Sequence, residues 1–286
     1  GRAVHWLGMH DPIVIVSGGS ATDAIHPLST SPKLFILGDS SGGGSATSAL
    51  LAQASPGGLP NASGAIISGG VLFSPWLNLK CDTPSYVSQA YKLETRDAWA
   101  AAKKTACSLP NLPTSKPAQV TIGGDVAFTS YPFTLAAQFS ANGQVYAGSE
   151  AKTTDPIASP SHAVASALAG MPPLQIHVGL SEVLVAENAI FATKLARAGP
   201  SCELHTYDSM WHVFPQYYEG CEHPTIQHLL FAYSAFNATA LFLKTLASGD
   251  GSLPWRSNGI PYSLSHYEYP RGVDTAMESY YGLFYV

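Results

Sequence analysis

Charged residues are scarce in this chain. Asp, Glu, Lys and Arg make up 12% of the 286 residues, which is about half of their usual share. The formal net charge is -5, and no run of basic residues is longer than the pair Lys103-Lys104. Because binding to nucleic acids depends on clustered positive charge, we do not expect a nucleic-acid partner.

Long hydrophobic runs are also missing. The longest ones, at residues 65–73 and 229–242, are too short or too interrupted by polar residues to span a bilayer. Hydrophobic residues nevertheless account for 46% of the chain, enough to bury a sizeable core in one large domain or two small ones. We therefore expect a folded chain without a transmembrane segment.

Cysteine is limited to four residues, none in a C-x-x-C pair, so a zinc site is not expected. An even cysteine count and two glycosylation sequons, at Asn61 and Asn237, are typical of an oxidising environment. We expect a secreted protein or one in the secretory-pathway lumen, with any targeting segment outside this chain. Four cysteines allow three disulfide pairings. Short loops favour the sequential one, which joins Cys81 to Cys107 and Cys202 to Cys221.

Apolar runs and turn residues predict an alternation of strands and helices. Residues 33–37 predict a buried strand, and the small residues from Gly42 onward predict a helix that ends before Pro56. The same criteria predict further strands at 65–73, 174–178 and 202–207, and helices at 183–198 and 225–246. Such alternation with short connections predicts an α/β fold with a doubly wound, mostly parallel sheet.

Two segments depart from this alternation. Residues 81–154 are rich in Pro, Ser, Thr and aromatic residues, and we predict one helix near 95–106. Their position between two strands is typical of a cap or lid insertion. Residues 249–286 have little periodicity, and we expect an irregular extension. The predicted core domain then comprises residues 1–80 and 155–248.

A candidate nucleophile lies between the first predicted strand and helix. The sequence Gly38-Asp39-Ser40-Ser41-Gly42 matches the G-x-S-x-G pattern, in which a serine occupies a strained turn and small neighbours prevent clashes. The Ser40 hydroxyl would then lie at a helix N-terminus, and the backbone N–H of Ser41 would stabilise an oxyanion.

A serine nucleophile needs a histidine base. Among the ten histidines, His212 alone is predicted to lie in a loop after the last strand and before the last helix. That loop belongs to the carboxyl edge of the sheet, where α/β proteins form their crevice. The predicted base is His212.

A carboxylate is needed to orient the histidine. Glu182 directly follows the strand at 174–178, at the same edge of the sheet, and is our preferred acid. Asp155, Glu187 and Asp208 are alternatives, although they are predicted in a turn, inside a helix and very close to His212, respectively.

Six blocks in order resemble the hormone-sensitive-lipase-like esterases of the α/β-hydrolase fold. The segment LGDSSGGG is similar to that family's GDSAGG block, and Ser74 to Leu79 is similar to its SPW-x-DL block. The remaining blocks are Asp155 to Pro160, Met171 to Leu174, Gly179 to Leu184 and His212-Val213-Phe214. The blocks extend over residues 33–246 and follow the order serine, acid, histidine of that fold.

The resemblance implies hydrolysis of carboxylic esters through an acyl-enzyme, on small to medium acyl esters and without a cofactor or metal. Two features depart from the family. Glu182 stands where Asp is usual, and only 39 residues precede Ser40. We therefore expect the family's H-G-G-G oxyanion loop and the first strands to be missing from this chain; Gly18-Gly19 only imitates that loop. There are two alternatives. One is a catalytically silent relative that binds an apolar molecule, and the other is an amide hydrolase with the same triad.

Overall fold

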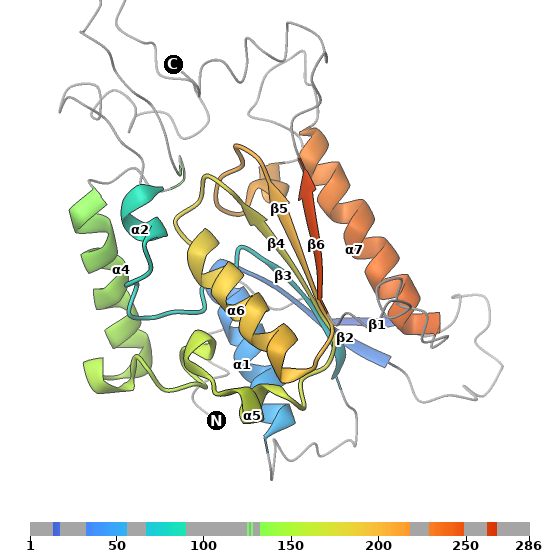
Figure 1. Cartoon of the computed structure of the whole chain (residues 1–286), viewed down its shortest axis with the longest axis horizontal. Coiled ribbons are helices and arrows are strands. Elements are labelled where there is room, and N and C mark those ends of the chain that lie inside the picture. The colour runs from blue at the N-terminus through green and yellow to red at the C-terminus, as the bar shows by residue number, and fades with distance from the viewer. Residues whose placement is uncertain are drawn as a thin grey trace, which may run out of the picture.

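The computed structural model describes residues 14–17, 33–55, 67–89, 125, 127, 132–217, 229–248 and 262–267. Their strands form one six-stranded sheet in the order β1-β2-β3-β4-β5-β6 (Figure 1). Strand β1 (Val14–Ser17) runs antiparallel to β2 (Lys33–Asp39), whereas every later neighbour is parallel. The later strands are β3 (Ile67–Phe73), β4 (Leu174–Gly179), β5 (Cys202–Tyr207) and β6 (Tyr262–Tyr267). The predicted mostly parallel sheet is confirmed.

Most of the longer helices follow the predicted strand-to-helix alternation. Those that follow a predicted strand are α1 (Ser40–Ala54), α6 (Val185–Ala198) and α7 (Leu230–Ser248). Within the predicted cap, α2 (Ser85–Ser88) and α4 (Pro132–Ala147) are described, while the helix predicted near residues 95–106 lies outside the described residues. Shorter elements are α5 (Ala165–Leu168) and three 3₁₀ turns, Glu150–Lys152, Pro160–His162 and Phe214–Tyr217.

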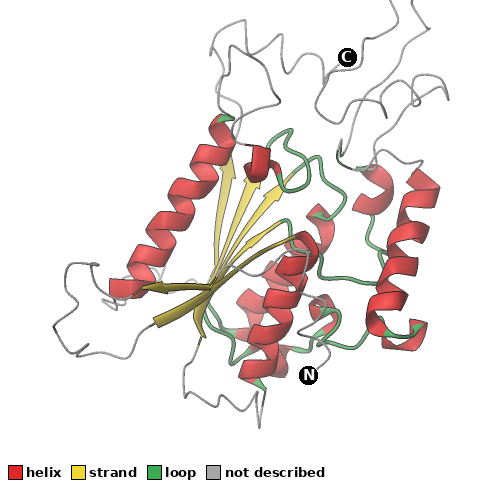
Figure 2. Ribbon diagram, turned by 180° about the vertical axis from the view of Figure 1, so that it is seen from behind, coloured by secondary structure: helices red, strands yellow, loops and turns green. Residues whose placement is uncertain are grey.

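The two faces of the sheet are covered by different helices. Helices α1 and α6 lie on one side of the strands and α7 lies on the other (Figures 1 and 2). Alternate residues of β4 follow this division, because successive side chains of a strand point to opposite faces. Leu174, Ile176 and Val178 join α1 and α6 in the main hydrophobic core, whereas Gln175 and His177 contact α7.

The sheet face beneath α7 carries several buried polar side chains. His177 Nδ1 lies 2.8 Å from the Tyr207 hydroxyl, and its Nε2 lies 2.9 Å from Gln175 Oε1 and 3.2 Å from Thr239 Oγ1. His205 stacks on His177, with ring centroids 4.9 Å apart, and its Nε2 lies 2.9 Å from Glu203 Oε2. Buried polar groups require such partners, and this network satisfies them inside the sheet.

The C-terminal segment differs from the prediction of an irregular extension. Residues 262–267 form β6, whose six residues pair in parallel register with Cys202–Tyr207 of β5. The surrounding Pro, Gly and aromatic residues concealed this strand, since its hydrogen-bonding partner lies about sixty residues earlier in the chain.

Helix α7 coincides with most of the helix predicted at residues 225–246 and ends two residues later, at Ser248. Among the described helices, α7 alone is long enough and apolar enough to cross a membrane, with a mean hydropathy of 1.2. Length and composition are the only criteria met. The core helix of a folded domain meets the same criteria. Phe231, Ala232 and Ala235 of α7 pack with Tyr207 and Phe214 in a second core cluster.

Candidate active site

Ser40 occupies a sharp turn between a strand and a helix. Strand β2 ends at Asp39 and helix α1 begins at Ser40, whose φ of +50° is in the left-handed region. This turn requires glycine at position 38, because a Cβ there would lie 2.5 Å from the carbonyl oxygen of Gly42. The backbone N–H of Trp76 donates to the Ser40 carbonyl (2.8 Å) and ties the turn to the end of β3. Local sequence therefore produces the strained, half-exposed serine that the pattern predicts.

Ser40, His212 and Glu182 form one chain of hydrogen bonds. His212 Nε2 lies 2.8 Å from Ser40 Oγ, and His212 Nδ1 lies 3.1 Å from Glu182 Oε2. Glu182 is fully buried, and His212 is 5% exposed. These distances are those of a nucleophile, a base and an orienting carboxylate.

Ser74 is a site residue that the motifs did not single out. Its hydroxyl donates to Glu182 Oε1 (3.0 Å) and accepts from the backbone N–H of Val213 (3.0 Å). Ser74 and Val213 both have positive φ, +47° and +49°. Ser74 belongs to the block that resembles SPW-x-DL, but only the folded chain directs its hydroxyl to Glu182.

The loops that carry Glu182 and His212 lie against each other. The backbone N–H of Leu180 donates to Tyr207 O (2.9 Å), and that of Ser181 donates to Met210 O (3.0 Å). Gly179 permits this approach, because a Cβ at that position would lie 2.2 Å from Met210 O. The acid and the histidine are thus held together by their backbones as well as by their side chains.

The electrostatic surroundings of His212 favour its protonated form. Burial lowers the pKa of His212, but the hydrogen bond and charge of Glu182, with the charges of Asp125 and Asp39, outweigh burial and raise it above 6.5. Among the described residues, Asp125, Glu182 and His212 are also the one group of three with potential metal-ligand atoms, all within 4.8 Å of one another. Glu182 and His212 are bonded to each other in this group, so it has the arrangement of a hydrogen-bonded acid-base site.

The three alternative acids lie in other surroundings. Glu187 is buried in α6, where its Oε1 accepts from the backbone N–H groups of Leu77 (2.6 Å) and Asn78 (3.2 Å). Burial raises its pKa to about 8. Asp155 is exposed and accepts from the N–H of Ile157 in a turn, and Asp208 is half-buried after β5. Of the four carboxylates considered from the sequence, Glu182 is the one bonded to the His212 ring.

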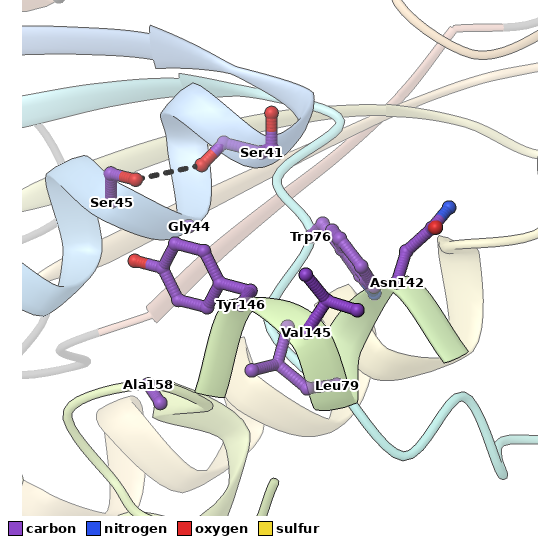
Figure 3. Close-up of a pocket in the computed structure, with 9 residues that line it drawn as sticks. All are labelled: Ser41, Gly44, Ser45, Trp76, Leu79, Asn142, Val145, Tyr146 and Ala158. Atoms are coloured by element: carbon purple, nitrogen blue, oxygen red, sulfur yellow. Dashed lines mark hydrogen bonds between the residues drawn. The ribbon is translucent and has the colours of Figure 1, made fainter. Parts of the chain in front are cut away.

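An apolar cavity opens beside the turn that holds the nucleophile. Its volume is about 310 Å³, and it lies between the start of α1 and helix α4 of the predicted cap (Figure 3). Ser41 lines the cavity together with Trp76 and Tyr146. The other lining residues are Gly44, Ser45, Leu79, Asn142, Val145 and Ala158.

The predicted disulfide pairing stays a prediction, because each predicted bond has one partner outside the described residues. Cys81 and Cys202 are both buried, while Cys107 and Cys221 lie outside the described residues. Cys202 packs in the main hydrophobic core, and Cys81 packs with Tyr86, Val183 and Leu184. Both side chains act there as small apolar groups, a common role of buried cysteine.

The two sequons are in different situations. Asn237 is exposed on α7, and Asn61 lies outside the described residues. Glycosylation and a secretory location stay predictions.

Comparisons with known proteins agree with the fold. A family model described as alpha/beta hydrolase fold matches residues 113–216, a range that contains Glu182 and His212 but not Ser40. A search of curated proteins found no match.

Solved structures of esterases are similar over part of their length. An esterase/lipase from an uncultured bacterium is 24% identical, with a TM-score of 0.48, over 75% of this chain and 53% of that one. A hormone-sensitive lipase from a metagenome library is 28% identical, with a TM-score of 0.43, over 64% and 46%. An esterase from the bacterial hormone-sensitive lipase family is 22% identical, with a TM-score of 0.42, over the same shares. The chain thus spans about half the length of these proteins.

The family match, the mostly parallel sheet and the order of the motifs agree with one another. They support the α/β-hydrolase fold predicted from the sequence.

Proposed function

We propose that this chain is a serine hydrolase of carboxylic esters, with Ser40, His212 and Glu182 as its catalytic triad. The observation that carries the proposal is the continuous chain of hydrogen bonds from Ser40 Oγ through both ring nitrogens of His212 to Glu182. The sequence blocks that resemble the hormone-sensitive-lipase-like esterases, together with the match to an alpha/beta hydrolase fold model, support the same activity.

In the proposed reaction, Ser40 Oγ attacks the carbonyl carbon of the ester while His212 Nε2 takes the hydroxyl proton. The tetrahedral intermediate then expels the alcohol, which receives that proton from His212, and an acyl-enzyme remains. Water attacks the acyl-enzyme with His212 again as the base, and the acid leaves as Ser40 regains its proton. Glu182 holds the ring in position and stabilises the imidazolium in both halves of the reaction.

The negative oxygen of the intermediate needs hydrogen-bond donors. The backbone N–H of Ser41, in the first turn of α1, is the donor that we assign in this chain. One such donor contributes about 3 to 4 kcal/mol to stabilising the transition state.

The cavity beside Ser41 suits an acyl or alkoxy group of small to medium size. Trp76, Leu79 and Val145 give it apolar walls, and its volume of about 310 Å³ is near the lower end of small-molecule sites. Since α4 supplies part of the wall, we propose that residues 81–154 act as a cap over the site.

Labelling with an alkyl fluorophosphonate tests the nucleophile. We expect the wild-type chain to be labelled once and Ser40→Ala not at all, with Ser41→Ala as a control that keeps the backbone donor. The same three proteins should be assayed with p-nitrophenyl esters from acetate to decanoate and with a matching p-nitroanilide.

Turnover that favours the shorter esters and disappears in Ser40→Ala would support the proposal. A folded wild-type chain without labelling or turnover would contradict it and favour a binding role. Faster cleavage of the anilide than of the esters would reassign the substrate to amides.

A further inference from the structure

Asp125 is a buried carboxylate that no motif singled out. Its side chain is fully buried, and its own N–H donates to Gln89 O (2.7 Å), so that the residues on either side of segment 90–124 meet at this point. We call residues 85–89 and Asp125 the neck of the insertion, because they flank residues 90–124 within it.

Asp125 contacts both loops that carry candidate catalytic side chains. Its Oδ2 accepts from the backbone N–H of Val183 (3.1 Å), the residue after Glu182. Its Oδ1 accepts from the backbone N–H of His212 (3.1 Å) and from that of Ala127 (3.2 Å). One carboxylate thus links the acid loop to the histidine loop.

The other side of the neck holds the same acid loop. The Ser85 hydroxyl donates to the Val183 carbonyl and accepts from the N–H of Ala186 (3.2 Å). Both backbone groups of Val183 are therefore bonded to the neck, one by Asp125 and one by Ser85. Since Val183 adjoins Glu182, a change in the neck would move the acid.

Asp125 also brings a second negative charge to the histidine. One of its carboxylate oxygens, one of Glu182 and a ring nitrogen of His212 lie within 4.8 Å of one another. Protonation of a buried imidazole is costly unless opposite charge is near. Burial raises the pKa of Asp125 to about 7, and the charge of His212 opposes that rise, so the two groups favour each other's charged forms.

We propose that Asp125 is a positioning residue of the candidate triad: it fixes the acid loop against the histidine loop, and its charge favours protonated His212 during acyl transfer. The neck of the insertion is then coupled directly to the catalytic groups. This inference rests on the proposed function, because a positioning role has meaning only if the triad turns over an ester.

The test compares Asp125→Asn with Asp82→Asn in the full chain. Both variants lose one negative charge from the insertion, residues 81–154. Asp82 is exposed, however, and its carboxylate accepts a hydrogen bond from the Asn78 side chain. Steady-state hydrolysis of a p-nitrophenyl ester, with active sites counted by the fluorophosphonate probe, gives kcat, KM and the pH profile of kcat/KM.

For Asp125→Asn we expect kcat to fall about 10- to 100-fold with KM changed less than about threefold, because misplaced catalytic groups slow the chemical step. We also expect the acid limb of the kcat/KM profile to move to lower pH, because His212 loses a negative neighbour while Glu182 and Asp39 remain. Asp82→Asn should match the wild type in both measurements.

Three outcomes decide the matter. Asp125→Asn with wild-type kcat and an unmoved acid limb would overturn the inference and leave the proposed function standing. A lower melting temperature with normal kcat and pH profile per active site would also overturn it, since Asp125 would then be purely structural. A wild-type chain without Ser40-dependent turnover would overturn the proposed function, and this inference with it.

Discussion

His212 and His177 are both buried, and both ring nitrogens of each have hydrogen-bond partners. His212 lies in a loop at the carboxyl edge of the sheet, between the Ser40 hydroxyl and the Glu182 carboxylate. His177 lies within β4, beneath α7, among the uncharged side chains of Tyr207, Gln175 and Thr239.

The pKa values of the two rings shift in opposite directions. Burial lowers the pKa of His177 far below 6.5, and the neighbouring His205 lowers it further. Burial also lowers the pKa of His212, but the bond and charge of Glu182 more than reverse that effect. Carboxylate partners, and not burial, therefore separate a histidine suited to proton transfer from one that only holds a structure together.

The largest expected effect comes from removing each histidine in turn. We expect His212→Asn to lower kcat for an ester on the order of 10⁶-fold, because Ser40 then has no base. His177→Asn should retain kcat within about fivefold per active site, since no catalytic group contacts its ring. Fluorophosphonate titration with steady-state kinetics measures both values. Equal losses in the two variants would contradict the distinction between the rings.

The next effect comes from giving His212 a neutral partner like those of His177. Glu182→Gln should lower kcat about 10⁴-fold, because an amide neither fixes the ring tautomer nor stabilises the imidazolium. Glu187→Gln is the matched control and should retain activity. Burial raises the pKa of Glu187 to about 8, so a neutral amide resembles the protonated carboxyl group at pH 7. If only Glu187→Gln lost activity, the acid would have to be reassigned.

The free energy of unfolding should depend on His177 and its hydrogen-bond partners. His177→Phe removes the partners of Tyr207 and Gln175 and should lower the free energy of unfolding by about 3 kcal/mol. Thr239→Val should cost about 1 kcal/mol, whereas Ser234→Ala, at an exposed site on the same helix, should cost little. Urea denaturation measures the three values, and a neutral His177→Phe would mean that the network does not stabilise the sheet.

The smallest effect concerns pH. Neutral His212 is the base, so kcat/KM should rise with pH, and the raised pKa of His212 places the midpoint above pH 6.5. Removing the partly exposed charge of Asp39 with Asp39→Asn should lower this midpoint by less than about one pH unit. A wild-type midpoint well below 6.5 would show that His212 resembles His177 in solution.

Local patterns were sufficient for much of the fold. The strand at 33–37 and the helix after it correspond to β2 and α1, and the prediction at 202–207 coincides with β5. Helix α4 and strand β6 were not foreseen. The Asn-Gly pair within α4 is typical of a turn, and β6 depends on pairing with β5. Long-range packing outweighed local preference in both elements.

The sequence by itself determined the strand-to-helix alternation, the Gly38-to-Gly42 turn and the order of Ser40, Glu182 and His212, because periodicity, small residues and chain order are local properties. Tertiary structure decided which other groups hold the candidate catalytic residues in place. Ser74 and Asp125 reach Glu182 and His212 from distant parts of the chain, and Cys81 and Cys202 are buried in two hydrophobic clusters. Hydrogen-bond direction, burial and charge at a site depend on which segments meet in space, and they separate His212 from His177.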